Sequence, residues 1–559
     1  MQAYSVIRRR IANFAYTPNS LAKSSILTFF ILALFNQTPL KPLVMAILIS
    51  PGRGSGNTGE RTLLFSRNLI GFTGILWAFH SLFGYAKIES LKSCLISNLI
   101  QVAAIQIIKL WNPIENSQEE NGAKKEKTSS FFLVVLTAIY LFSFLNFPQR
   151  LSTFLLGWDH LNGHLWITSQ VYLEGYIRIN SQDGIGIYPK AQFPLILSFS
   201  NEPIGFQALV QGMIFVEILL AISALRILHD LLFREKRNEK IDRIIQYTAT
   251  ISASPILFLF IFYGWTSLLL TTCSLLVLAW QFGNSQSRQS WVIAFFAALA
   301  ALQSWTLIAP VVLVLLLGNK VRENKKRFVL FACIFVTING SSVFAILQFS
   351  GLDQVSKGFE SKSIWFLMIF LGAALPISYL MFNIRAQLPF KLLVLATYLE
   401  AILIWLGTFS GLEIPYYAVK VFLMTIIFLT PHVISLVFSR IKLPKVKLVL
   451  AGFLVIVLFG YGRVPASDYS YLNLIQGKDL QTNWLSENII RQLPQKSSSN
   501  VILNSVNVVN VSALFDLGKI ENQELIAFDV GYICKLAETG KDYIVLSDPA
   551  ASAIKCNWK

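Results

Sequence analysis

The sequence predicts an all-α polytopic membrane protein with about 11–13 transmembrane helices, followed by a small soluble α/β domain. Two observations favour this fold class. Of the 559 residues, 54% are hydrophobic and only 14% are charged, whereas soluble domains have roughly 25% charged residues. Apolar segments long enough to cross a bilayer recur as far as about residue 463, so 1–463 form the membrane domain and 464–559 the soluble domain.

The net charge of +17 has a membrane explanation and does not indicate a nucleic-acid partner. Lys and Arg concentrate in the cytoplasmic loops of membrane proteins. With the predicted spans, all strongly basic segments fall on one side, at 112–130, 234–243, 319–327 and 439–447. This pattern predicts a multi-pass protein of the plasma (inner) membrane, with the loop 148–203 and the tail on the outer face.

The first half of the membrane domain begins with two apolar runs in residues 25–50, separated by NQTPLK. They form either one tilted helix or a short hairpin. The spans predicted after them are 67–85, 91–110, 131–147 and 205–229. The large outer loop 148–203 separates the last two.

The second half contains two predicted turns at the outer face. Spans 247–263 and 265–282 form a hairpin that turns at Tyr263-Gly264-Trp265. The apolar run 290–318 is basic at both ends, so it is predicted to be two short helices that turn near Gln303-Ser304-Trp305. The remaining predicted spans are 328–349, 364–382, 390–409, 417–438 and 447–463.

The tail 464–559 alternates a helical segment, NWLSENIIRQL, with the short apolar strands VILNSV, ELIAFDV and DYIVLSDP, which predicts the α/β domain. Its cysteines, Cys534 and Cys556, either form a disulfide or stay apart. Cys94, Cys273 and Cys333 lie in or beside apolar segments, where buried thiols are expected. No CxxC or HExxH motif indicates a zinc site.

The polar stretch 157–194 is the first candidate site, because lipid does not accept its mixture of charged and aromatic residues. Asp159 stands where an outward-going span ends. Its carboxylate can act as a general base towards a hydroxyl or hold a divalent cation against a phosphate. His160 and His164, four residues apart, can assist as base, ligand or phosphate donor. Alternatively, Asp159 only caps a short helix.

The second candidate cluster lies at the outer end of a late span and contains Glu413, Tyr416, Tyr417 and Lys420. Lys420 falls about one turn inside the apolar segment, where an ammonium group is costly and tends to mark a binding site. Alternatively, the Lys420 side chain extends along the helix and places its ammonium group at the membrane–water interface. Glu217 lies deep in a span, where its carboxyl group either packs between helices or binds and releases a proton.

Three motifs together resemble the C-type membrane glycosyltransferases, which share the GT-C fold. They are Gly157-Trp158-Asp159 with His164, the Tyr188-Pro189 element that returns the chain to the membrane, and Tyr416-Tyr417-x-x-Lys420. The resemblance covers about 130–463. Two departures stand out: no second acidic residue directly neighbours Asp159, and Gln192 occupies the place where some relatives have a histidine after the Tyr-Pro element.

The resemblance implies an enzyme that moves a sugar from a polyprenyl-phosphate donor to a glycan, lipid or protein acceptor. It implies catalysis by Asp159 and His164. It also implies substrate binding by His160, Glu174, Tyr188, Tyr416, Tyr417 and Lys420. The missing second acid would come from Glu174, Asp183 or Asp353. Whether Asp159 and His164 hold Mg²⁺ or Mn²⁺ stays open.

Two other classes remain. A transporter or flippase of a lipid-linked or anionic substrate would explain Glu217 and Lys420 as intramembrane charges on a substrate path. A non-catalytic assembly protein with a GT-C-like fold would explain the absent acid pair.

Overall fold

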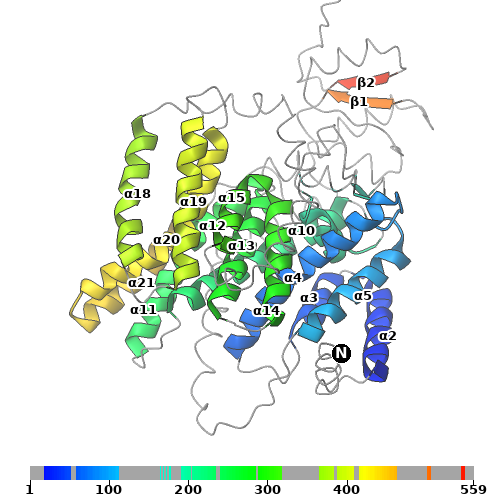
Figure 1. Cartoon of the computed structure of the whole chain (residues 1–559), viewed down its shortest axis with the longest axis horizontal. Coiled ribbons are helices and arrows are strands. Elements are labelled where there is room, and N and C mark those ends of the chain that lie inside the picture. Colours follow the sequence, from blue (N-terminus) through cyan, green and yellow to red (C-terminus); the bar gives the residue numbers. More distant parts are fainter. Residues whose placement is uncertain are drawn as a thin grey trace, which may run out of the picture.

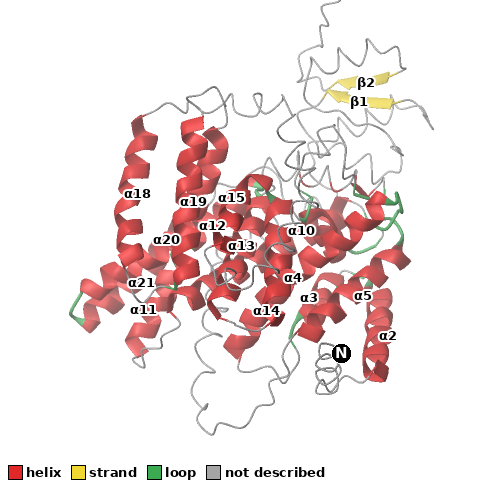
Figure 2. Ribbon diagram, in the orientation of Figure 1, coloured by secondary structure: helices red, strands yellow, loops and turns green. Residues whose placement is uncertain are grey.

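In the residues that it describes, the structure, a computed structural model, is a bundle of helices with one pair of strands (Figures 1 and 2). It describes residues 18–38, 40–51, 58–111, 164, 168, 171–172, 175–177, 190–202, 204, 206–233, 240–284, 288–317, 364–382, 387–407, 415–461, 500–504 and 543–547. The predicted spans 131–147 and 328–349, the segments NWLSENIIRQL and ELIAFDV, and Cys333, Cys534 and Cys556 lie outside these residues.

The helices of the N-terminal half are α2 Pro18–Phe35, α3 Lys41–Ile49, α4 Thr58–Tyr85, α5 Cys94–Trp111, α9 Gln192–Phe199, α10 Phe206–Phe233, α11 Lys240–Ile251, α12 Ser254–Tyr263 and α13 Thr266–Asn284. Those that follow are α14 Arg288–Ser304, the 3₁₀ turn η2 Thr306–Ile308, α15 Ala309–Leu317, α18 Ile364–Phe382, α19 Leu388–Gly407, α20 Pro415–Arg440 and α21 Pro444–Tyr461. The strands are β1 Asn500–Asn504 and β2 Tyr543–Ser547.

The described helices have the composition of membrane spans, which confirms the predicted all-α membrane class. Five helical stretches are long and apolar enough to cross a bilayer: Arg61–Tyr85, Gly212–Phe233, Ile241–Ile261, Leu388–Gly407 and Tyr417–Arg440. The third of them runs from α11 through a short turn into α12. Helices at the edges of the bundle also expose large apolar side chains, such as Leu34 on α2 (72%) and Phe382 on α18 (84%). A soluble protein rarely leaves such surfaces open to water, whereas lipid covers them at no cost.

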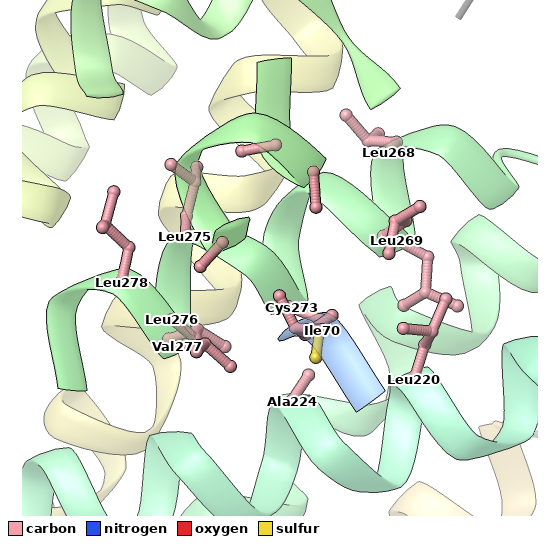
Figure 3. Packing of buried hydrophobic residues seen from close by; sticks show 14 of the residues in the cluster. Ile70, Leu220, Ala224, Leu268, Leu269, Cys273, Leu275, Leu276, Val277 and Leu278 are labelled. Atoms are coloured by element: carbon pink, nitrogen blue, oxygen red, sulfur yellow. The ribbon is translucent and has the colours of Figure 1, made fainter. Parts of the chain in front are cut away.

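Helix α13 lies at the centre of the bundle and is buried along almost its whole length. It packs against α10, α14 and α19. Figure 3 shows Cys273 of α13 close to Ile70 of α4 and Ala224 of α10, and its thiol is fully buried, as predicted. A helix that is apolar on all sides belongs in such a position, because every face of it has an apolar neighbour.

Both predicted helix breaks are present. Helix α12 ends at Gly264, whose φ of +75° is the left-handed conformation that glycine adopts without strain. The long apolar run after α13 is interrupted at Trp305, which has an extended backbone (φ −157°, ψ 101°) between α14 and η2. The Gly264 break was predicted from a turn between two apolar runs, and the Trp305 break from the basic segments at both ends of one apolar run.

Two features were not predicted. The expected span 247–263 is divided at Ser252-Ala253, because Pro255 favours the first turn of a new helix, α12. The end of the predicted loop 148–203 forms α9, and all eight of its residues are buried. Helix α9 packs against α10, α4 and α3.

Residues 25–50 form two helices, α2 and α3, joined by a turn, and not one tilted helix. The turn contacts the segment between α9 and α10, since the amide of Glu202 donates a hydrogen bond to the carbonyl of Asn36 (2.7 Å). The link between α4 and α5 is similarly bonded to the loop, from Leu91 N to Gly175 O (2.8 Å). Four segments predicted on the outer side thus meet at one end of the bundle: the α2–α3 turn, the α4–α5 link, the loop at Gly175 and the segment between α9 and α10.

A different set of polar residues gathers at the opposite end of α10. Arg226 donates to the hydroxyl of Thr62 (3.2 Å) and pairs with Asp230 (4.0 Å), which also accepts a hydrogen bond from the indole of Trp280 (2.8 Å). These residues adjoin the predicted cytoplasmic loops. The described contacts at the two ends of the bundle thus join segments that the charge pattern predicts on opposite sides.

The two described strands of the tail pair in parallel, with Asn500 opposite Tyr543. Strand β1 overlaps the predicted segment VILNSV and begins one residue before it, and β2 lies within DYIVLSDP. Parallel strands need a crossover connection of about a dozen residues or more, and residues 505–542 connect these two.

Candidate functional site

The structure describes some of the predicted site residues. His164 lies in the loop that precedes α9, Glu217 lies in α10, and Tyr417 and Lys420 lie in the first turns of α20. Outside the described residues lie Asp159, His160, Glu174, Asp183, Tyr188, Asp353 and Glu413, together with the side chain of Tyr416.

His164 is buried, with 2% of its surface exposed, and faces Gln192 at the start of α9. The amide Nε2 of Gln192 lies 3.3 Å from Nδ1 of His164. In this orientation the amide donates to Nδ1, which leaves the ring proton on Nε2. The hydroxyl of Thr168 donates to the carbonyl of His164 and holds its backbone. The side-chain amide of Gln192 thus fixes the orientation of His164.

The segment before α9 is fixed to the break between α14 and η2. The amides of Lys190 and Ala191 both donate to the carbonyl of Gln303, at 2.7 and 2.9 Å. Lys190 is 5% exposed and Gln303 is 3% exposed, so this junction is shielded from solvent. The loop that carries His164 therefore ends at one of the two predicted outer breaks.

The start of α20 contacts both outer breaks. The ammonium group of Lys420 lies 4.7 Å from the centre of the Trp265 ring, in the turn between α12 and α13. Three residues earlier, the ring of Tyr417 lies 6.1 Å from that of Trp305, beside the end of α14. A cation over an indole face is attracted by the ring quadrupole, so Trp265 restrains the position of the Lys420 charge.

Glu217 is joined to the same region through Thr266, the residue after Trp265. The Thr266 hydroxyl donates to Glu217 Oε1 at 2.5 Å, and both side chains are fully buried. Sequence reasoning identified Glu217 but assigned it no partner. It identified Trp265, Gln303 and Trp305 only as turn residues, because a sequence does not show which turns meet.

These contacts bring two of the predicted clusters to one end of the bundle. His164 in the loop contacts Gln192 at the start of α9, and the residues just before α9 are hydrogen-bonded to the end of α14. The residues that follow α14 and α12 in turn contact the start of α20. The described groups are a histidine held by an amide, a phenol and an ammonium group beside an indole. Such groups can donate hydrogen bonds and positive charge to an anionic ligand.

The described residues alone do not form a metal site. Among them, no group of three or more His, Cys, Asp or Glu side chains is placed to hold an ion. The Nδ1 atom of His164 is also occupied by the Gln192 amide. No metal-dependent step is therefore derived for this site.

No family model, curated protein or solved structure matches the chain. The relation to the GT-C fold is thus a resemblance of motifs.

Proposed function

We propose that the protein is a GT-C-like membrane glycosyltransferase. It transfers a sugar from a polyprenyl-phosphate donor to a glycan, lipid or protein acceptor at the outer face of the plasma membrane. The observation that supports this proposal is the meeting of the two motif-bearing segments, since the loop of His164 and the start of α20 both adjoin the break after α14. In this proposal the tail is an α/β domain on the same outer face, and the complete membrane domain has about 11–13 spans.

The proposed reaction is a single displacement at the anomeric carbon. Asp159 removes the proton of the acceptor hydroxyl, and the acceptor oxygen attacks the anomeric carbon. The bond from this carbon to the phosphate oxygen breaks, and polyprenyl phosphate leaves with the electron pair. Lys420 and Tyr417 stabilise the charge that develops on the phosphate, while His164, oriented by Gln192, donates a hydrogen bond from Nε2.

The test uses the full chain reconstituted in vesicles with labelled polyprenyl-phosphate sugars. Asp159→Asn should lower the transfer rate by about 100-fold or more, as expected for loss of a general base. Lys420→Met should lower it by a similar factor, roughly 100-fold, because charge stabilisation at the leaving phosphate is lost. Lys87→Met is the matched control, since Lys87 is exposed in the link between α4 and α5. Unchanged transfer by Asp159→Asn would exclude that residue as the base.

A transporter or flippase is the second candidate, favoured by one observation. Glu217 is a carboxylate fully buried within an apolar span, and intramembrane carboxylates often mark ion or substrate paths. The same vesicles distinguish the two functions. Movement of labelled lipid across the bilayer without transfer, lost in Glu217→Gln, would support transport and contradict the transferase.

A further inference from the structure

A second polar site lies away from the contacts described above, where α2, α3, α5 and the link between α9 and α10 meet. A cavity with an empty volume of about 250 Å³, part of it open to solvent, is lined there by Asn36, Lys41, Leu91, Cys94, Ser97, Asn98, Tyr172, Leu197, Glu202 and Ile204. About one water molecule fits inside it. None of these residues was identified from the sequence as a site.

Lys41 is the deepest charged group in this cavity. It is the first residue of α3 and only 3% exposed, yet no described side chain lies within hydrogen-bonding distance of its ammonium group. Burial lowers the pKa of Lys41 to about 8, and the nearby Glu202 opposes this shift. A buried ammonium group without a direct partner is costly, so this position calls for an anionic group or a bound water.

Ser97 supplies a second donor. The hydroxyl oxygen of Ser97 accepts a hydrogen bond from the side-chain amide of Gln101 (3.2 Å). The hydroxyl hydrogen of Ser97 can therefore be donated to another group. The amides of Asn36 and Asn98 are both directed at the sulfur of Cys94, at 3.0 and 3.5 Å. Cys94 was expected to be a buried thiol but is exposed, because it begins α5 at the cavity wall.

Glu202 is nearer the opening and brings negative charge. One of its oxygens accepts a hydrogen bond from the amide of Ile204 (3.2 Å), and the hydroxyl of Tyr172 donates to the same carboxylate. Burial and Glu202 together raise the pKa of Tyr172 to about 12, so the phenol stays protonated as a donor. The cavity therefore carries a positive group inside and a negative group towards its opening.

The surroundings of the cavity are apolar and face outward. Leu40 and Leu43 beside Lys41, and Leu95 and Leu99 beside Cys94, are each more than half exposed. The cavity lies at the ends of helices and not at their centres. In a membrane protein, the ends of the spanning helices lie at the depth of the lipid headgroups. Figure 1 shows α2 and α5 at the edge of the bundle.

We propose that this cavity binds the headgroup of a phospholipid with a primary ammonium group, of the ethanolamine type. One phosphate oxygen enters the inner part and accepts hydrogen bonds from Lys41 and Ser97. The ammonium group lies at the opening and donates to Glu202, while the acyl chains lie against the exposed leucines of α3 and α5. This site does not depend on the proposed glycosyltransferase activity.

The two charges of the cavity predict the lipid selectivity. A glycerol headgroup has no cation for Glu202, and a choline headgroup has a cation that donates no hydrogen bond. Free phosphoethanolamine has both charges but no acyl chains to cover the leucines, so it binds much more weakly than the lipid.

The experiment measures lipid retention by native mass spectrometry on the delipidated full chain, with ethanolamine, choline and glycerol phospholipids of identical acyl chains. The ethanolamine lipid should bind at least about tenfold more tightly, the effect of one charge-assisted hydrogen bond. Glu202→Gln should reduce its affinity to that of the other two lipids, whereas Lys41→Met should weaken the binding of all three, because each of them has the phosphate that Lys41 contacts. Lys92→Met and Glu89→Gln, which remove exposed charges at the same end, should leave it unchanged.

Equal affinity of the three lipids for the unaltered chain would overturn the proposal, and this comparison needs no variant to fold. Retained selectivity in Glu202→Gln would also overturn it, as would unchanged affinity for all three lipids in Lys41→Met. Competition by free phosphoethanolamine at the same concentration as the lipid would contradict a lipid as the occupant.

Discussion

Thr266 determines how the carboxylate of Glu217 is accommodated inside an apolar bundle. Its hydroxyl supplies a hydrogen bond to a side chain that is fully buried between α10 and α13. The same residue follows Trp265, which holds Lys420. One short segment at the start of α13 thus restrains two charged side chains from different helices.

Replacing Thr266 by valine keeps the shape of the side chain but removes the donor. Thr266→Val should lower the free energy of unfolding by roughly 1–3 kcal/mol, because a buried carboxylate loses a partner. Thr272→Val is the control, since the Thr272 hydroxyl bonds only the carbonyl of Leu268 in its own helix. Thermal unfolding in detergent measures both variants, and equal losses would contradict the special role of Thr266.

Lys41 makes stability depend on pH in an unusual direction. Its pKa in the folded protein is about 8, below the value of 10.5 for a free lysine, so the unfolded chain binds one more proton between these pH values. Stability contributed by this residue therefore rises with pH in that interval, by up to roughly 3 kcal/mol. Between pH 7 and 10, the free energy of unfolding of the lipid-free wild type should rise relative to that of Lys41→Met. A constant difference would contradict this assignment.

At the residue scale, sequence reasoning found single charges but not their partners. Glu217 and Lys420 stood out because each interrupts an apolar run. Lys41 and Glu202 did not, because each lies at a helix end, where a charged residue is ordinary. Their proximity depends on how α2, α3 and α9 pack, which a single sequence does not specify.

Among the elements, α4 and α14 are in close contact at a glycine. A Cβ atom on Gly74 would collide with the backbone carbonyl of Phe296, whereas one on Gly71 would meet nothing within 4 Å. Small residues allow helix backbones to approach in this way in membrane proteins.

Gly74→Ala should therefore push α4 and α14 apart and lower the free energy of unfolding by roughly 1–3 kcal/mol. Gly71→Ala lies in the same helix and should cause no loss, since alanine favours the helix by up to about 1 kcal/mol. Unfolding midpoints in detergent compare the two. A similar loss in both variants would show that helix flexibility, and not the close contact, explains the effect.

Elements bounded by charge or glycine were predictable. The breaks at Gly264 and Trp305 followed from a turn residue and from basic segments at both ends of one apolar run. Helix α9 was not predictable, because its sequence QFPLILSF is too short to be recognised as a span and too apolar to show a helical period. The break between α11 and α12 could have been predicted from Pro255, because proline at this place indicates the start of a new helix.

For the whole molecule, the structure divides the helix ends into two groups, and the charge pattern predicts which group faces the cytoplasm. Lys87, between α4 and α5, belongs to the group with Asn36 and Glu202. Lys442, between α20 and α21, belongs to the opposite group, near α11. Both lysines are exposed.

In a cysteine-free background, Lys87→Cys should react with a membrane-impermeant thiol reagent on intact cells. Lys442→Cys should react only after the cells are permeabilised, because basic loops stay in the cytoplasm. Labelling in the reverse order would invert the proposed sidedness. It would also move the candidate glycosyl-transfer site to the cytoplasmic face.

Helix α9 has a consequence for biogenesis. Its eight residues are about 12 Å long, less than half of the roughly 30 Å hydrocarbon core, so the insertion machinery does not release it into lipid as a span. It must travel with its loop and enter the bundle afterwards from the side on which the loop lies. Gly212 of α10 leaves the room that α9 then fills, since a Cβ there would collide with the Ser200 hydroxyl. We therefore expect the docking of α9, and with it the alignment of Gln192 with His164, to follow the insertion of the spans.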